Sequence, residues 1–253
     1  MRTISQIIKL MSKHSKNEII KALKLQQEIF GDELFIPKKK RTTIVVKETS
    51  ALFTEPELFP KEKADWEKTT SLNELEKLIC NCTKCRLHQN RNKFVFGTGN
   101  SNADVLVIGE GPGAEEDKQG LPFVGRAGQL LTDMLRAIKF EREEVYIGNV
   151  VKCRPPENRT PLPDEMETCM PYLKKQCDLI KPKLILCLGL TAAKGLLKKR
   201  ESLGDLRGKV FKYEGAKVMV TYHSAALLRN PHWKKDCWED LKKFRKLYEE
   251  IVG

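Results

Sequence analysis

Four short apolar runs that alternate with helical patterns constrain the fold of this chain more than any other feature. Each run is bounded by polar residues or glycine, and the runs span residues 105–109, 145–151, 184–189 and 218–222. The helical patterns cover residues 125–138, 164–180, 191–197 and 233–251. Continuous apolar strands between helices are typical of a parallel sheet buried on both faces. We therefore expect an α/β fold, a three-layer α/β/α sandwich with a central, mainly parallel four-stranded sheet.

Polar or glycine-rich positions stand where three of these runs end. Gly109–Gly113 follows the first run, Asn149 lies near the end of the second, and His223 follows the fourth. In open parallel sheets, ligands bind outside the carboxyl ends of the strands. We expect these three positions to converge on one crevice.

The first 70 residues differ from the rest of the chain. Ser15–Glu18 has the pattern of a capping box, and helical spacing follows it up to Gly31. The segment Thr49–Thr70 is rich in Glu, Lys, Pro and Thr, which is typical of a linker. This predicts an N-terminal extension of helix plus linker over residues 1–70, of unknown function, and a main domain over residues 71–253.

The charge and the cysteine content point to a nucleic-acid partner in a reducing compartment. The net charge of +12 favours a polyanion, although lysine-rich solvated surfaces would produce the same number. No apolar run is long enough to cross a membrane, and the N-terminus does not resemble a signal peptide. Because the cytosol keeps thiols reduced, we expect a cytoplasmic protein with metal-ligating rather than disulfide-bonded cysteines.

Four of the eight cysteines form two pairs with different spacing. Cys82 and Cys85 make a C-x2-C pair, with Cys80 just before it, whereas Cys153 and Cys169 stand sixteen positions apart. Structural zinc usually takes two tight pairs, so this spacing favours an iron–sulfur staple over zinc or unrelated thiols without excluding either. Cys187 lies inside an apolar run, where a free cysteine packs as a small hydrophobe.

The glycine-rich loop after the first run does not have the spacing of a dinucleotide-binding motif. Gly109–Ala114 continues into Glu115, Glu116 and Asp117, and three carboxylates at this point would repel a pyrophosphate. A pocket shaped by backbone and rimmed by carboxylates suits a neutral substrate, or one that develops positive charge.

Several segments together resemble the family 4 uracil-DNA glycosylases, in order and in approximate spacing, from about Leu78 to Leu247. The matching segments are Gly109–Gly113, Gln119–Gly128, Asn149–Pro156, Thr221–His223 and Leu227–Pro231. The resemblance implies a DNA-repair enzyme that flips uracil out of DNA and hydrolyses its N-glycosidic bond. It also implies a 4Fe–4S cluster on Cys82, Cys85, Cys153 and Cys169.

The resemblance places five residues against the base. It implies that Phe123 stacks on the flipped uracil, that Asn149 pairs with N3–H and O4, and that Glu116 lies near C5 and opposes the methyl group of thymine. Gly111 would line the same pocket, at a position where a better-known glycosylase family has aspartate. His223 would meet O2 and stabilise negative charge on the leaving base.

Glu110 is the candidate to position water or to stabilise the oxocarbenium-like sugar, which makes Glu110 and His223 the expected catalytic pair. Leu227, Leu228 and Arg229 are expected to fill the gap that the flipped nucleotide leaves. Arg154 and Arg159 are candidates for phosphate contacts, with surface salt bridges as the alternative. One residue departs from the family, because Ser224 stands where proline is usual.

Two other classes of function stay open at this point. One is a cluster-bearing DNA-binding protein without glycosylase activity, which the joint presence of Glu110, Asn149 and His223 disfavours. The other is a zinc protein with a nucleotide-binding sheet, which the carboxylates of the loop disfavour. We expect a monomer that acts on single- or double-stranded DNA containing uracil, in the cytoplasm and associated with the nucleoid.

Overall fold

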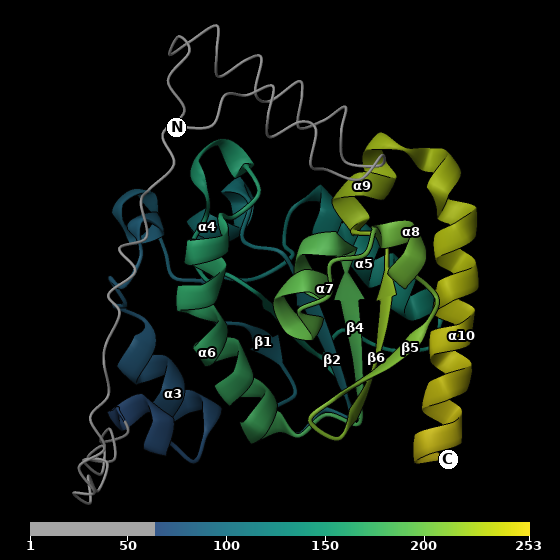
Figure 1. The fold of residues 1–253 in the computed structure, drawn as a ribbon, viewed down its shortest axis with the longest axis horizontal. Coiled ribbons are helices and arrows are strands. Elements are labelled where there is room, and N and C mark those ends of the chain that lie inside the picture. The colour runs from purple at the N-terminus through teal and green to yellow at the C-terminus, as the bar shows by residue number, and fades with distance from the viewer. Residues whose placement is uncertain (1–63) are drawn as a thin grey trace, which may run out of the picture. The chain divides into compact units, whose positions relative to one another are not determined.

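The structure, a computed structural model, describes residues 64–253, and a six-stranded sheet runs through their centre (Figure 1). The strand order is β1-β3-β2-β4-β6-β5. Its four inner strands are parallel: β3 (Tyr146–Asn149), β2 (Val105–Gly109), β4 (Leu184–Leu188) and β6 (Ala216–Thr221). The expected helix after Ser15 and most of the expected linker lie outside the described residues.

The expected parallel core is confirmed, but the expected number of four strands was incomplete. Two edge strands, β1 (Thr98–Gly99) and β5 (Val210–Tyr213), pair antiparallel with β3 and β6. β1 has only two residues, and β5 alternates between exposed and half-buried positions. Neither strand forms a continuous apolar run, because an edge strand buries few of its side chains.

Helices cover both faces of the sheet and form the other two layers. One face packs against α3 (Leu72–Ile79), α6 (Pro163–Ile180), α7 (Gly189–Leu197) and α8 (Leu203–Leu206). The opposite face packs against α5 (Arg126–Ala137) and α10 (Lys234–Val252). In Figure 1, α6 and α7 lie on the viewer's side of the sheet. β2, β3 and β4 are buried along their whole length, and β6 is buried except at Lys217. This burial explains why the strands lie in apolar runs.

Side chains alternate between the two cores along each strand. Ile185 of β4 lies beside Leu106 of β2 and Val218 of β6, and all three belong to the core under α6 and α7. Leu186 and Met219, one position further along, belong to the core under α5 and α10. This alternation follows from the period of two in a strand.

Shorter elements connect these layers. They are η1 (Asp65–Lys68), η2 (Arg86–Asn90), α4 (Ala114–Gln119), η3 (Pro156–Asn158), α9 (Ser224–Arg229) and η4 (Pro231–Trp233). Trp66 of η1 packs edge to face against Tyr172 of α6, with ring centroids 4.9 Å apart.

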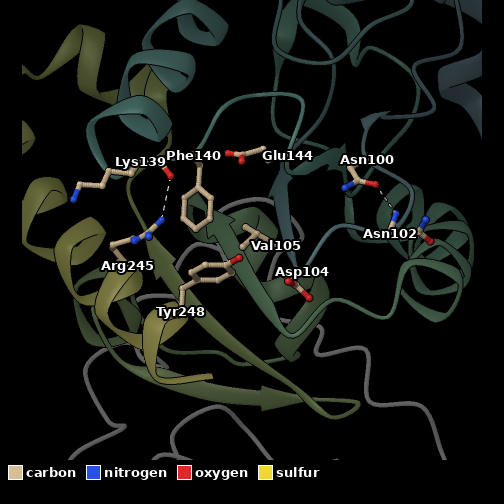
Figure 2. A pocket seen from close by; sticks show the side chains of 9 residues that line it. All are labelled: Asn100, Asn102, Asp104, Val105, Lys139, Phe140, Glu144, Arg245 and Tyr248. Atoms are coloured by element: carbon tan, nitrogen blue, oxygen red, sulfur yellow. Dashed lines mark hydrogen bonds between the residues drawn. The ribbon is translucent and has the colours of Figure 1, made fainter. Parts of the chain in front are cut away.

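A pocket lies at the amino ends of the strands, away from the residues that follow β2, β3 and β6 (Figure 2). Asp104 and Val105 line it where β2 begins, and Tyr248 and Arg245 line it from α10. Arg245 donates hydrogen bonds of 3.4 and 3.1 Å to the carbonyl oxygens of Ile138 and Lys139. Its guanidinium therefore ties α10 to the end of α5.

Candidate active site

The side chains of Asn149 and Phe123 meet above the backbone of Gly109, where β2 and β3 end. A Cβ atom at Gly109 would lie 2.4 Å from Asn149 Oδ1 and 2.5 Å from Phe123 Cζ. Asn149 is 2% exposed, so its carboxamide is buried. The strand ends thus bring a buried carboxamide and an aromatic ring together, as the strand order predicts.

His223 completes this pocket from the end of β6. Its ring stacks on Phe123 with centroids 5.5 Å apart and an angle of 27° between the planes. Gly189, which follows β4, approaches the same histidine, because a Cβ atom there would lie 3.2 Å from His223 Cβ. The ends of β2, β3 and β6 therefore meet at one place, as expected, and the end of β4 joins them.

The protonation state of His223 follows from its contacts. Its Nδ1 accepts a hydrogen bond of 3.1 Å from the Ala225 backbone N–H, and His223 thereby serves as the N-cap of α9. Burial, followed by the positive charge of Arg229, lowers the pKa of His223 to about 4. The ring is therefore neutral near pH 7, and its only N–H is on Nε2.

The carboxylate of Glu116 is held by three backbone N–H groups. Oε1 accepts from Val124 at 2.9 Å and from Gly125 at 3.0 Å, and Oε2 accepts from Gly113 at 3.1 Å. Gly113 precedes α4 and Gly125 precedes α5, so this one side chain caps both helices. Such caps satisfy N–H groups that have no partner within the helix.

Phe123 has a left-handed backbone, with φ of 53°, which is uncommon for a residue with a side chain. Two neighbours keep it there. Arg142 Nη2 donates a 2.6 Å hydrogen bond to the carbonyl oxygen of Pro122. A Cβ atom at Gly128 would lie 1.9 Å from the carbonyl oxygen of Phe123, so only glycine fits below the loop. The ring orientation is therefore set by the surrounding structure.

Glu110 points toward α7, where Thr191 Oγ1 donates a hydrogen bond to its Oε2. Sequence reasoning missed Thr191, because 81 positions separate it from Glu110 and no motif marks it. Gly111, the next residue, has no room for a side chain: a Cβ atom there would lie 2.6 Å from Val151 Cγ2. Glu110 and Gly111 thus follow Gly109 directly. The Glu110 side chain points toward α7, and Gly111 lies against Val151.

The residues expected to contact DNA differ in accessibility. Leu228 is 37% exposed, whereas Leu227 is 1% exposed and packs in the core under α5. Arg159 forms a bidentate ion pair with Glu165, in which Nη1 donates to Oε2 at 2.8 Å and Nη2 donates to Oε1 at 2.6 Å. Within residues 64–253, Arg154 hydrogen-bonds through its Nε alone, which donates to Asn158 Oδ1 at 2.8 Å. Leu228 and Arg154 are thus more available to a ligand than Leu227 and Arg159.

Cys82, Cys85, Cys153 and Cys169, named here the cysteine corner, are free thiols contributed by three segments of the chain. Cys153 and Cys169 are buried, and Cys82 and Cys85 pack against the same core. Burial raises the pKa of the Cys169 thiol to about 12, opposed by Lys152 and assisted by Cys153 and Cys85. Among residues 64–253, no three His, Cys, Asp or Glu side chains are close enough to hold a single metal ion.

The other cysteines do not belong to this corner. Cys80 follows α3 and its Sγ lies 3.5 Å from the carbonyl oxygen of Lys77. Cys187 is fully buried in β4, where it packs as expected. Polar hydrogens do approach the corner: Arg91 Nη1 lies 3.2 Å from Cys153 Sγ, and the Tyr172 hydroxyl lies 3.3 Å from Cys82 Sγ. Sequence reasoning missed both residues, because neither is near its partner in the chain.

Comparison with known proteins agrees with this geometry. The family model of the Uracil DNA glycosylase superfamily matches residues 96–242, more than half of the chain. A type-4 uracil-DNA glycosylase of Pyrobaculum aerophilum is 47% identical over 181 residues, which cover 68% of this chain and 92% of that protein. The type-4 enzyme of Archaeoglobus fulgidus is 42% identical over 185 residues, covering 70% and 93%.

A third relative, the type-4 enzyme of Thermotoga maritima, is 50% identical over 151 residues, covering 59% of this chain and 79% of its own length. Residues 96–242, which the family model matches, contain the strand ends that carry Glu110, Asn149 and His223. The chain belongs to the uracil-DNA glycosylase superfamily, and within it to the type-4 enzymes.

Proposed function

We propose that this protein excises uracil from DNA by hydrolysing the N-glycosidic bond, which leaves an abasic site and begins base excision repair. The observation that carries the proposal is the meeting of Asn149, Phe123 and His223 at the strand ends. An aromatic face, a buried carboxamide and a neutral imidazole are what a pocket needs to read one flipped base. The membership of the type-4 family supports the same substrate.

Asn149 is proposed to distinguish uracil from cytosine. Its carboxamide offers one acceptor and one donor, which pair with N3–H and O4 of uracil. Cytosine has the reverse order of donor and acceptor along this edge, so it would leave buried polar groups unpaired. Such a mismatch discriminates strongly because the cost of an unpaired buried group is large.

Phe123 and Glu116 are proposed to set the shape of the pocket. The ring of Phe123 supplies a stacking face, and its orientation is held by Arg142 and Gly128. Glu116 is fixed by three backbone N–H groups, so it forms a rigid wall rather than a mobile acid. We place this wall near C5, where the methyl group of thymine would collide with it. The backbone at Gly111 would line the pocket further along the same loop.

His223 is proposed to stabilise the leaving base. As the C1′–N1 bond breaks, the bonding electrons move to the base and part of the negative charge reaches O2. The Nε2–H of the neutral His223 ring donates to this oxygen without transferring its proton. A preorganised donor of this kind is worth about 2.7–4 kcal/mol of transition-state stabilisation.

Glu110 is proposed to act on the other product, the sugar. Its carboxylate, held by Thr191, would stabilise the positive charge that develops at C1′ or orient the water that attacks it. Water then adds its oxygen to C1′, and the proton that it gives up neutralises the uracil anion. The deoxyribose hydroxyl and free uracil are the products.

Leu228 and Arg229 are the proposed wedge that replaces the flipped nucleotide, since Leu227 is buried. Arg154 is the better candidate for a phosphate contact, and Arg159 would contribute mainly through its pair with Glu165. No helix within residues 64–253 is long and apolar enough to cross a membrane. We propose a monomer that acts on single- or double-stranded DNA in the cytoplasm, associated with the nucleoid.

The cysteine corner is proposed to hold a 4Fe–4S cluster. Its four thiols form an all-sulfur donor set, and N–H and O–H groups point at two of the sulfurs, a pattern that suits thiolate ligands. When bound, the cluster would cross-link the segment after α3 to the sheet domain. Cys82 rather than Cys80 is the proposed ligand because Cys80 Sγ faces the carbonyl oxygen of Lys77.

The experiment that tests the activity is incubation with DNA containing one uracil, single- or double-stranded, followed by alkaline cleavage. We expect abasic-site product from the wild-type protein and its near-complete loss in Asn149→Ala. Asn102→Ala is the matched control, because Asn102 lies in the pocket at the opposite end of the sheet. No product from cluster-replete wild-type protein would overturn the proposal.

The cofactor is tested separately. Cluster-loaded protein is expected to show broad visible absorbance that Cys153→Ala loses and Cys187→Ala keeps, because Cys187 is buried in β4. Colourless protein with one bound zinc would favour the alternative that the cysteine spacing leaves open.

A further inference from the structure

Arg91 reaches across the cysteine corner and touches both of its halves. Nη1 donates to the carbonyl oxygen of Cys82 at 2.6 Å and lies 3.2 Å from Cys153 Sγ. Nη2 donates to the carbonyl oxygen of Cys80 at 3.2 Å. The guanidinium also lies over the Phe94 ring, with its carbon 5.4 Å from the ring centroid. One side chain therefore joins the turn that follows α3 to a cysteine 62 positions away.

This half-buried cation has no carboxylate partner within residues 64–253. Two other arginines near the corner have one: Arg86 pairs with Asp164, and Arg159 pairs with Glu165. A charge that is partly removed from water needs compensation. The acceptors around Arg91 are two carbonyl oxygens, an aromatic face and a sulfur, and only the sulfur can carry a full negative charge. Cys153 Sγ is thus the one acceptor around Arg91 that could compensate the charge of the guanidinium.

We propose that Arg91 is a positioning residue for the cluster, one that holds the Cys153 thiolate against the Cys80–Cys82 turn and offsets negative charge on the four thiolates. This inference rests on the proposed cluster. Two consequences follow. Loss of Arg91 frees the turn that carries Cys82, so the cluster is released faster. Loss of its positive charge also lowers the reduction potential, because hydrogen bonds and net charge at the sulfurs set that potential.

Tyr172 provides a comparison inside the same corner. Its hydroxyl lies 3.3 Å from Cys82 Sγ, so it can donate one hydrogen bond but brings no charge. Tyr172→Phe is therefore expected to have a smaller effect on the potential than Arg91→Gln. Arg91→Lys keeps the charge but loses the planar fork that engages two carbonyl oxygens and a sulfur together.

The experiment uses the full-length, cluster-loaded protein. The rate at which visible absorbance is lost in the presence of an iron chelator is measured first, and the reduction potential by voltammetry second. For Arg91→Gln we expect roughly tenfold faster loss, which corresponds to about 1.4 kcal/mol, together with a lower potential. Arg91→Lys is expected to lose the cluster faster at a potential near that of the wild type. Arg136→Gln is the control, because Arg136 lies on α5 and forms an exposed pair with Glu141.

The outcomes separate this inference from the cofactor proposal. Wild-type protein without visible absorbance would overturn the cluster itself and this inference with it. A stable cluster in the wild type, with Arg91→Gln indistinguishable from Arg136→Gln in both measurements, would overturn the inference alone. Should Arg91→Gln not fold, Arg91→Lys decides, because an unchanged rate of cluster loss in that variant contradicts a positioning role.

Discussion

The Ala225 backbone N–H donates to Nδ1 of His223, so the start of helix α9 determines which nitrogen of the catalytic candidate carries hydrogen. The cap requires a lone pair on Nδ1, which leaves Nε2–H as the donor. Burial and Arg229 favour the same neutral form. The ring is thereby prepared to donate a hydrogen bond to a developing anion without accepting a proton first.

The first prediction concerns pH. The pKa of His223 is about 4 in the folded protein, below the ordinary value near 6.5. Between these values the unfolded chain binds a proton that the folded chain does not, so this histidine destabilises the fold as pH falls from about 6.5 to about 4. We expect its ring resonances, followed by NMR, to titrate near pH 4. Arg229→Ala should raise the pKa of His223. Titration of His223 near pH 6.5 would contradict the account.

Gly109 provides the second prediction. Alanine there would place its Cβ atom within 2.5 Å of both Asn149 and Phe123, so one of these side chains has to move. Displacement of a binding group by about 1 Å can cost about 10²-fold, and we expect a loss of this size in kcat/KM from Gly109→Ala. Gly204→Ala is the matched control, because a Cβ atom there would lie 3.7 Å from Ser202 Oγ, an ordinary contact distance. Equal kinetics for the two variants would show that Gly109 does not shape the pocket.

Thr191 carries the third prediction. Thr191→Val keeps the shape of the side chain but removes the hydrogen bond to Glu110. Hydrogen bonds to charged groups contribute about 1.5–3 kcal/mol. We expect kcat to fall roughly tenfold or more in single-turnover assays, with little change in KM, because the carboxylate acts on the transition state. Thr168→Val removes a comparable hydroxyl from α6, far from Glu110, and should leave both constants unchanged. A rise in KM alone would instead place Glu110 in substrate binding.

The sequence predicted the strands that are buried on both faces. It did not predict side-chain contacts between residues that are far apart in the chain. The runs that become β2 and β4 are apolar throughout because helices cover both of their faces. β5 has one exposed side, so its residues alternate and produce no run. Asn149, Phe123 and His223 lie together because strand ends converge. Thr191 and Arg91 act through partners 81 and 62 positions away, and no local pattern encodes such a contact.

Ser224 leads to the last prediction. It is the first residue of α9, its buried hydroxyl has no hydrogen-bond partner, and its backbone N–H donates to no group within residues 64–253. Proline is favoured at this helix position because the missing N–H is not needed there. The preceding residue, His223, has φ of −71° and ψ of 136°, which is the conformation that a following proline requires.

We therefore expect Ser224→Pro to stabilise the protein by about 0.4–1 kcal/mol through the lower entropy of the unfolded chain. Thermal unfolding would detect this as a rise of about 1–4 °C in the midpoint. Ser224→Ala removes the unpaired hydroxyl without restricting φ, so the difference between the two variants isolates the backbone effect. Activity should persist in both, because the Ala225 N–H still holds Nδ1 of His223. A lower midpoint for Ser224→Pro than for Ser224→Ala would mean that the proline ring does not fit against the buried start of α9.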